Sequence, residues 1–148
     1  MAGRSSLKQL MVESTNGVEL KINSDPANLR RVRKQIEDFA RSAGLPQQAC
    51  HYVGLAANEA LANIMRHGYG GAKDRPILVT ARRYDGGVQL TIRDWAAPFD
   101  PGALPPGNQD PSTPGGIGLI CIRKVMDEVH FSRLPDGMLL TMVKRAAR

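Results

Sequence analysis

The 148-residue chain has little of several things on which whole classes of protein depend. Its two cysteines, Cys50 and Cys121, belong to no CxxC pair and no cysteine–histidine cluster, so we expect buried, reduced thiols rather than a disulfide framework or a zinc site. No run of about 18 apolar residues is present to cross a membrane. The N-terminal MAGRSSLKQL lacks the apolar stretch of a signal peptide. We therefore expect a cytoplasmic protein with no membrane association.

Aromatic residues are also scarce: three phenylalanines, three tyrosines and one tryptophan. This matters because the formal net charge of +6 at first suggests a nucleic-acid ligand. The basic residues concentrate in RRVRK (30–34) and KRAAR (144–148), and no basic stripe is interleaved with aromatic residues. We interpret them as a solvated helix face and tail, or as a patch for an acidic protein partner, and expect no direct nucleic-acid binding.

Hydrophobic periodicity predicts three pairs of strands and three helices. The predicted strands lie near 10–12, 18–22, 77–81, 88–92, 129–134 and 138–143, and the helices near 26–43, 46–67 and 117–126. A loop of some twenty residues with six prolines separates the fourth strand from the last helix, and a loop this long is usually functional or disordered. Three amphipathic helices can cover only one face of a sheet built from three hairpins. The sequence therefore predicts one α/β domain over residues 1–148, a two-layer sandwich with a mixed, mostly antiparallel sheet and helices on one face.

The apolar helix predicted at 46–67 carries three polar residues at four-residue steps: Glu59, Asn63 and His67. On a helical wheel they fall within about 80° of one another, on the shoulder of the buried face. Half-buried polar groups there need partners or cost about 1–3 kcal/mol each. Any one of them alone is best explained by hydrogen bonds to the neighbouring backbone.

Two other features make a nucleotide site the better explanation for the set. Asp94 ends a predicted strand before a turn of small residues, and Gly115-Gly116-Ile117-Gly118 opens a helix directly after the long loop. Backbone N–H groups and the dipole at such a helix start favour an anion. We interpret Asp94 as an acceptor for the adenine amino group and the glycines as a phosphate turn. The Asn63 oxygen would bind Mg²⁺, with Glu59 as general base.

Three segments resemble the sequence boxes of a known family. ANEALANIMRHGY resembles the N box of the GHKL ATPases, with its E-x-x-x-N core followed by H-G. IRDWAAPFDP resembles their next box, and GGIGLICIRKVMDEV resembles the last box of the anti-sigma factor serine/threonine kinases of bacterial partner-switching systems. The resemblance implies a Bergerat-type (histidine-kinase-like ATPase) sandwich that binds Mg-ATP. It also implies phosphorylation of a small anti-anti-sigma (STAS-type) protein and sequestration of a sigma factor or other regulatory protein, usually by a homodimer.

By position, the resemblance implies that Glu59 is the catalytic base and Asn63 the magnesium ligand. The implied nucleotide contacts are Asn63, Asp94, Ala96, Gly115, Gly116, Gly118 and Leu119, beneath a lid from about Asp100 to Pro114. His67 also falls at a family position, where packing under the lid explains it as well as a ligand role does. Two departures stand out: Ala96 replaces a family glycine, and Met138 with Leu139 replace a frequent hydroxyl residue.

Other functions compete with the kinase. The departure at Ala96 favours a binding-only antagonist of the same fold, with weak or no kinase activity. The ATPase half of a sensor histidine kinase is disfavoured, because no helix hairpin with a phospho-acceptor histidine precedes the predicted domain and His51, His67 and His130 all lie within it. A DNA-binding function would rest on charge alone.

Overall fold

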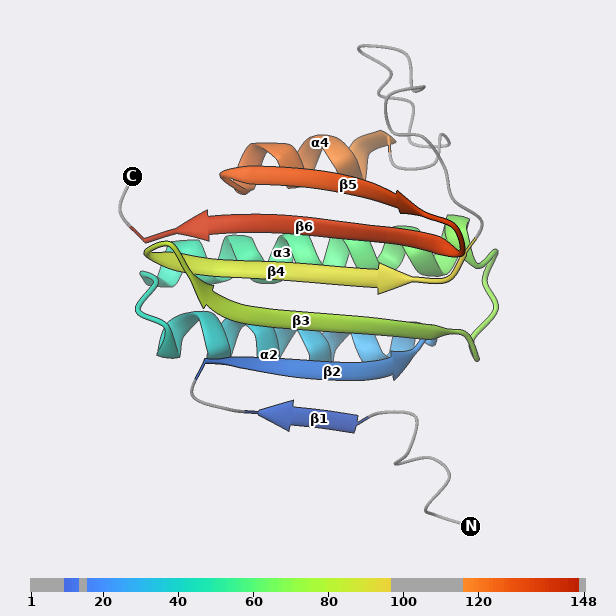
Figure 1. The fold of residues 1–148 in the computed structure, drawn as a ribbon, viewed down its shortest axis with the longest axis horizontal. Coiled ribbons are helices and arrows are strands. Elements are labelled where there is room, and N and C mark those ends of the chain that lie inside the picture. Colours follow the sequence, from blue (N-terminus) through green and yellow to red (C-terminus); the bar gives the residue numbers. More distant parts are fainter. Residues whose placement is uncertain (1–9, 14–15, 97–115, 147–148) are drawn as a thin grey trace.

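The structure is a computed structural model that describes residues 10–13, 16–96 and 116–146. Its elements follow the chain as β1 (Leu10–Glu13), β2 (Gly17–Asn23), η1 (Pro26–Asn28), α2 (Leu29–Ser42), α3 (Gln47–Asn63), η2 (Ile64–Gly68), β3 (Pro76–Tyr84), β4 (Gly87–Asp94), α4 (Gly116–Val125), β5 (Glu128–Leu134) and β6 (Gly137–Arg145) (Figure 1). The predicted order of strands and helices is confirmed. The proline-rich segment 97–115 lies outside the described residues.

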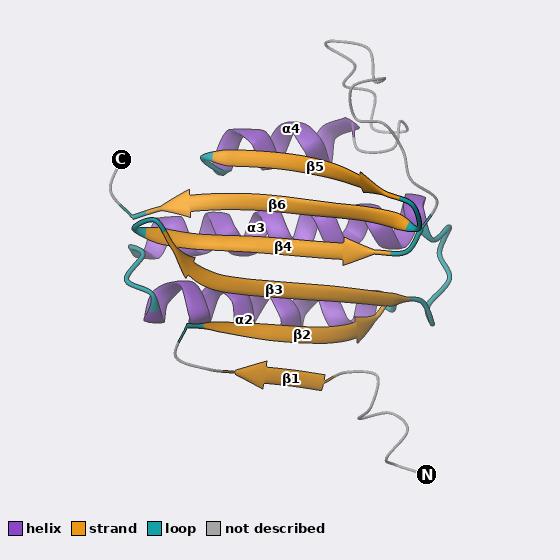
Figure 2. Ribbon diagram, viewed as in Figure 1, coloured by secondary structure: helices purple, strands orange, loops and turns teal. Residues whose placement is uncertain are grey.

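The six strands form one sheet in the order β1-β2-β3-β4-β6-β5. The α-helices α2, α3 and α4 all lie behind the same face of this sheet (Figure 2). The predicted two-layer α/β sandwich is thus confirmed. One detail differs: every described strand pairing is antiparallel, so the sheet is not mixed. The reason is that β6, and not β5, pairs with β4; β5 runs parallel to β4 but is separated from it by β6.

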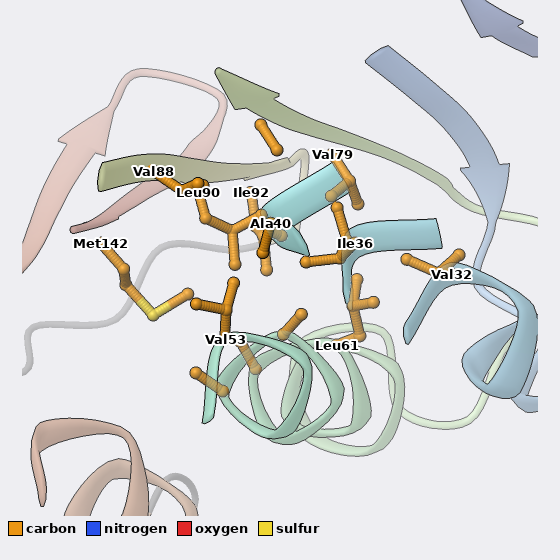
Figure 3. Packing of buried hydrophobic residues seen from close by; sticks show 14 of the residues in the cluster. Val32, Ile36, Ala40, Val53, Leu61, Val79, Val88, Leu90, Ile92 and Met142 are labelled. Carbon is orange, nitrogen blue, oxygen red and sulfur yellow. The ribbon is translucent and has the colours of Figure 1, made fainter. Parts of the chain in front are cut away.

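The core lies between the helices and the inner face of the sheet. Helix α2 contributes Val32, Ile36, Phe39 and Ala40, spaced three or four residues apart as an amphipathic helix requires. Strand β4 buries every second residue, and its Leu90 meets the helices in one continuous apolar layer (Figure 3). Hydrophobic periodicity thus located this helix, and its apolar side faces the core.

Local sequence signals set several of the element boundaries. Asp25 caps the short helix η1 by accepting a hydrogen bond of 2.9 Å from the Ala27 N–H. The turn between β3 and β4 places Asp85 and Gly86 at φ values of 50° and 75°, the conformation that a two-residue hairpin favours. In the part of the chain that the structure describes, no helix is long and apolar enough to cross a membrane.

The outer face of the sheet is covered by no described helix (Figure 2). Side chains alternate along a strand, so the residues next to the inward Ile77, Ile92 and Leu140 along each strand point outward. In register across the sheet, Lys21 lies beside Leu78, Leu78 beside Arg93, and Arg93 beside Leu139. The outer face is therefore a mixed surface of half-buried apolar and charged side chains.

The core and the outer face of the sheet predict different costs for removing a leucine side chain. Leu61→Ala, at a fully buried position, should lower the free energy of unfolding by about 2–5 kcal/mol because it leaves a cavity in the core. Leu139→Ala, on the half-buried outer face, should cost about 1 kcal/mol or less. Urea denaturation of both variants checks this. Equal losses would contradict the assignment of an inner and an outer face.

Candidate functional site

A pocket lies between the helices and the sheet at the end of β4. Its walls come from α3, η2, α4, the end of β4, the beginning of β6 and the middle of β5. The lining residues are Ala60, Asn63, Ile64, His67, Gly68, Ile92, Asp94, Ala96, Leu119, Ile122, Phe131, Met138 and Leu140. Of the residues predicted as site residues, the structure brings Asn63, Asp94, Ala96 and Leu119 together here. The pocket is thus largely apolar with a few polar groups, the usual composition of a small-molecule site.

Asp94 is the most unusual of these residues. It is the last residue of β4 and only 5% exposed, the one buried charged residue among those that the structure describes. One carboxylate oxygen accepts a hydrogen bond of 2.9 Å from the Ala96 N–H. Burial raises the pKa of the Asp94 carboxyl above its usual value, and the backbone N–H groups of Ala96 and Met138, with the charge of Arg93, oppose that rise. A carboxylate held in an apolar pocket is suited to accept a further hydrogen bond from a ligand.

The turn after β4 is fixed from outside the pocket by Tyr69. The Tyr69 hydroxyl accepts a hydrogen bond of 2.8 Å from the Trp95 N–H and donates one of 2.7 Å to the Pro76 carbonyl. These two bonds tie the loop after η2 to the beginning of β3 and to the end of β4. The backbone beside Asp94 is therefore held on both sides.

Ala96 fits this turn without backbone strain. Among the described non-glycine residues only Asp85 has a positive φ, so the methyl group of Ala96 occupies an ordinary backbone conformation. The Ala96 side chain faces Gly68: a Cβ built on Gly68 would lie 3.2 Å from the Ala96 Cβ. The family glycine would leave space at position 96. Here the Ala96 methyl group fills that space, and Gly68, which has no side chain, leaves room for it on the opposite wall.

The helix carrying Glu59 and Asn63 changes type at its end. Asn63 is the last residue of α3, and Ile64–Gly68 forms a π-helix, with the Tyr69 N–H donating to the Ile64 carbonyl at 2.8 Å. Glu59 and Asn63 are half-buried, as predicted. The prediction that His67 is half-buried in the same line is wrong, because the wider π turn shifts its position around the axis. His67 is exposed and contributes to the rim of the pocket.

Glu59 lies beside the pocket rather than in its wall. Its carboxylate has no hydrogen-bond or ion-pair partner within the described ranges. The charge of Glu59 affects Cys121 of α4. Burial raises the pKa of the Cys121 thiol, and the negative charge of Glu59 raises this pKa further. Glu59 is therefore a half-buried carboxylate at the contact of α3 with α4, available to a group that enters between them. Both cysteines are free thiols, as predicted, but only Cys50 is buried; Cys121 is half-buried, so the prediction of a buried thiol there is wrong.

The glycine-rich segment is described only in part. Helix α4 begins at Gly116, so Gly116 and Gly118 lie in its first turn. Leu119, one residue on, is buried in the pocket beside Ile122. Gly115 and the lid predicted from Asp100 to Pro114 lie outside the described residues. The prediction that a helix opens at this glycine segment is confirmed.

Sequence reasoning missed most of the apolar wall. Ile92, Ile122, Phe131 and Leu140 line the pocket but follow the same buried-face pattern as ordinary core residues. Met138 was noted only as a departure from the family. In the structure its side chain lines the pocket and its backbone N–H hydrogen-bonds Asp94, a role that depends little on the side chain. Of these residues only Ile92, two positions before Asp94, had a signal in the sequence.

The polar groups also limit what kind of metal site is possible. Among the described residues, no group of three or more His, Cys, Asp or Glu side chains is arranged to hold a metal ion. The amide oxygen of Asn63 is a suitable ligand for a hard cation. A cation at this position would therefore take most of its ligands from the oxygens of a bound molecule, and the residues present fit a magnesium–phosphate group.

Comparison with known proteins identifies the family. The family model described as the histidine kinase-like ATPase domain matches residues 22–144. The chain belongs to this family. The proteins named serine-protein kinase RsbW from Listeria innocua and Bacillus pumilus are 24% and 25% identical to it, covering 86% and 90% of this chain and 85% and 88% of theirs. The resemblance inferred from the sequence boxes is therefore confirmed.

Two solved structures are similar in fold. The RsbU and RsbW domains of Rv1364c from Mycobacterium tuberculosis match with a TM-score of 0.60 and 22% identity, over 86% of this chain and 31% of that longer one. The histidine kinase domain of Erythrobacter litoralis EL346 matches with a TM-score of 0.54 and 17% identity, over 85% of this chain and 62% of that one. The histidine kinase-like ATPase fold of this chain agrees with both.

The burial of Asp94 predicts a dependence of stability on pH. Because its folded-state pKa is raised, Asp94 favours the folded state below its ordinary pKa of 3.8, and this contribution is lost as the pH rises through the folded-state pKa. Asn at this position does not titrate. The free energy of unfolding of Asp94→Asn minus that of the wild type should therefore increase from about pH 3 to pH 7. Denaturation of both proteins across this range measures it, and a difference that is flat or falls with pH would contradict the assignment.

Proposed function

We propose that this protein is an ATP-dependent serine/threonine kinase of the anti-sigma type. The observation that carries the proposal is the pocket that joins the buried carboxylate of Asp94 to the amide of Asn63 beneath the first turn of α4. Membership of the histidine kinase-like ATPase family and similarity over most of the chain to proteins named serine-protein kinase support it.

In this proposal the pocket holds Mg-ATP. Asp94 accepts a hydrogen bond from the adenine amino group, and the apolar side chains of Ile92 and Met138 enclose the base. Backbone N–H groups of Gly116 and Gly118 in the first turn of α4, with that of Gly115, would bind the phosphates, because the dipole of α4 favours negative charge there. Asn63 would supply an oxygen ligand to Mg²⁺, and Ala96 and Leu119 line the same pocket.

The reaction is transfer of a phosphoryl group to a serine or threonine of a partner protein. ATP supplies that group. Glu59 orients the attacking hydroxyl and takes its proton as the new oxygen–phosphorus bond forms and ADP leaves. The half-burial of Glu59 and its lack of a described partner leave its carboxylate free for this role. Its position one helical turn before Asn63, about 6 Å along the axis, lets both side chains reach one phosphate group.

The proposed partners rest on the family resemblance of the sequence boxes, and the similarity to proteins named serine-protein kinase RsbW supports them. We propose that a small anti-anti-sigma protein of the STAS type is the phosphorylation substrate. We further propose that the kinase sequesters a sigma factor, or another regulatory protein, and so regulates transcription. Each chain would fold as one domain over residues 1–148, and two chains would form a homodimer in the cytoplasm. Direct binding to nucleic acid is not part of the proposal.

One observation favours a second candidate, a binding-only antagonist of the same fold. Glu59, the proposed base, lies beside the pocket and not in its described wall. By contrast, Ala96, which the sequence suggested as the obstacle to nucleotide binding, is accommodated by Gly68. The choice between the two candidates therefore depends on phosphoryl transfer rather than on nucleotide binding.

The deciding experiment incubates the full chain with labelled ATP, Mg²⁺ and the STAS-type protein of the same organism. Label on the partner supports the kinase. A stable complex without label would replace the kinase by the binding-only antagonist. If neither the nucleotide nor the partner binds, the proposed function is wrong.

Asp94→Asn should weaken ATP binding by about tenfold or more. The amide exposes an N–H group to the adenine amino group in place of an acceptor, and an unpaired buried polar group costs about 1–3 kcal/mol. Isothermal titration calorimetry measures the affinity. Asp74→Asn, at an exposed position in the loop before β3, is the control and should bind as the wild type does. Equal affinities for Asp94→Asn and the wild type would remove Asp94 from the site.

The two polar residues of α3 should separate chemistry from binding. Glu59→Gln keeps the size of the side chain but removes the base, so transfer to the partner should be lost while ATP binding and the protein complex persist. Asn63→Ala removes the proposed magnesium ligand and should weaken Mg-ATP binding itself. Single-turnover transfer and calorimetry on both variants test this. A Glu59→Gln protein that transfers phosphate at the wild-type rate would show that Glu59 is only a structural carboxylate.

A further inference from the structure

The only tryptophan of the chain, Trp95, stands exposed directly after Asp94. Its relative exposure is 41%, which makes it one of three large hydrophobic side chains exposed in the described parts of the chain. Neither the nucleotide pocket nor the core uses its ring. An exposed indole on the surface of a small protein is a frequent anchor for a binding partner.

The Trp95 ring is held in place before any partner arrives. The Arg93 guanidinium lies over it at 4.3 Å from the ring centroid. Arg93 is itself fixed, because it donates to the Asp136 carboxylate at 2.6 Å and to the Asp94 carbonyl. Two ordered side chains of the types most enriched in binding hot spots thus lie together, and their conformational entropy is already lost in the free protein.

A groove beside Trp95 supplies the rest of a docking surface. It is lined by Lys21, Pro76, Leu78 and Trp95, together with Asn23 and Asp74. Leu78 is half-buried and lies next to Arg93 in the strand register, so the groove borders Arg93 on the outer face of the sheet. The surface therefore combines the apolar side chains of Pro76 and Leu78 with the exposed indole of Trp95.

The groove is lined by one cation, Lys21, and one anion, Asp74, and further cations flank it. Lys21 is exposed and has no ion-pair partner among the described residues, and the same holds for Lys73 in the loop before β3. Arg31 is tied to the groove wall through Asn28: its guanidinium donates to the Asn28 side chain at 3.1 Å, and Asn28 donates to the Asn23 side chain at 2.7 Å. The acidic Asp74 is already paired with Arg75. This excess of unpaired cations matches a partner segment that is acidic and carries an apolar anchor residue.

We propose that Trp95, Arg93 and the adjoining groove form a docking surface for an acidic segment of the protein that receives the phosphoryl group. This inference rests on the proposed kinase function. The surface lies on the outer face of the sheet, away from the nucleotide pocket, but Trp95 follows Asp94 directly in the chain. Gly137 packs against the backbone of both residues: a Cβ on Gly137 would lie 2.0 Å from the Asp94 carbonyl oxygen and 2.8 Å from the Trp95 Cα.

The test measures binding and phosphorylation of the STAS-type protein by the full chain and its variants. Trp95→Ala should weaken the complex about tenfold or more and raise the KM for the protein substrate, with the KM for ATP unchanged. Trp95→Phe should restore part of the affinity. Lys21→Glu should weaken binding by a smaller factor that grows as the salt concentration falls, because screening then decreases.

Tyr84 provides a matched control. It is 36% exposed, lies on the same outer face at the far end of β3, and has its own arginine, Arg82, at 5.1 Å from the ring centroid. Tyr84→Ala therefore removes an equivalent aromatic–arginine pair without touching the groove. It should leave the partner affinity unchanged.

Trp95 also reports on its own surface without mutation. As the single tryptophan, its fluorescence emission should shift to shorter wavelength when a tryptophan-free form of the partner covers the ring. The same titration with a single-stranded oligonucleotide should give no shift. An oligonucleotide that binds and causes the shift would overturn the assignment to a protein segment.

The remaining outcomes separate this inference from the proposed function. If the wild type binds and phosphorylates the partner and Trp95→Ala does so equally well, the docking surface is wrong and the kinase stands. If Trp95→Ala and Tyr84→Ala lose affinity to the same extent, the effect is not local to the groove and the inference is also wrong. If the wild type neither binds nor phosphorylates the partner, the proposed function fails together with the inference built on it.

Discussion

The arrangement of the site depends on the hydrogen bonds that backbone N–H groups donate to the carboxylate of Asp94. A buried carboxylate without such donors would be strongly destabilising, and here Ala96 and Met138 supply them from two separate elements. The turn after β4 and the hairpin of β5 and β6 are therefore both positioned by one side chain. Because β6 pairs with β4, the beginning of one strand lies beside the end of the other, and this juxtaposition makes the shared bonding possible.

Close backbone approach is the second constraint on this region. Gly68 faces Ala96, and Gly137 lies against the backbone of Asp94 and Trp95, so the walls around the end of β4 are nearer to one another than larger side chains allow. Alanine at position 96, where the family has glycine, is compatible with the fold because the facing residue is Gly68. Family patterns that treat each position separately miss this compensation, which depends on two residues 28 positions apart in the sequence.

The sequence predicted the elements better than their arrangement. Alternation and turn residues located all six strands, because these signals are local. The placement of β6 between β4 and β5 is a non-local choice that no short pattern encodes. Asp94 and Asn63 were found through chemistry at element ends, and the structure places both in one pocket. Phe131 and Ile122 were not found, since an apolar residue that lines a cavity has the same pattern as one that fills the core.

The π-helix at Ile64–Gly68 has a consequence for the length of the chain in this region. A π turn holds one more residue than an α turn, so η2 contains in effect a single-residue insertion between Asn63 and Tyr69. Removing that residue would restore α-helical geometry and rotate everything after it by about 100° around the helix axis. The Tyr69 hydroxyl would then point away from the Trp95 N–H and the Pro76 carbonyl that it now connects. The spacing between Asn63, the proposed magnesium ligand, and Tyr69, the residue that braces the Asp94 turn, is therefore fixed to a single residue.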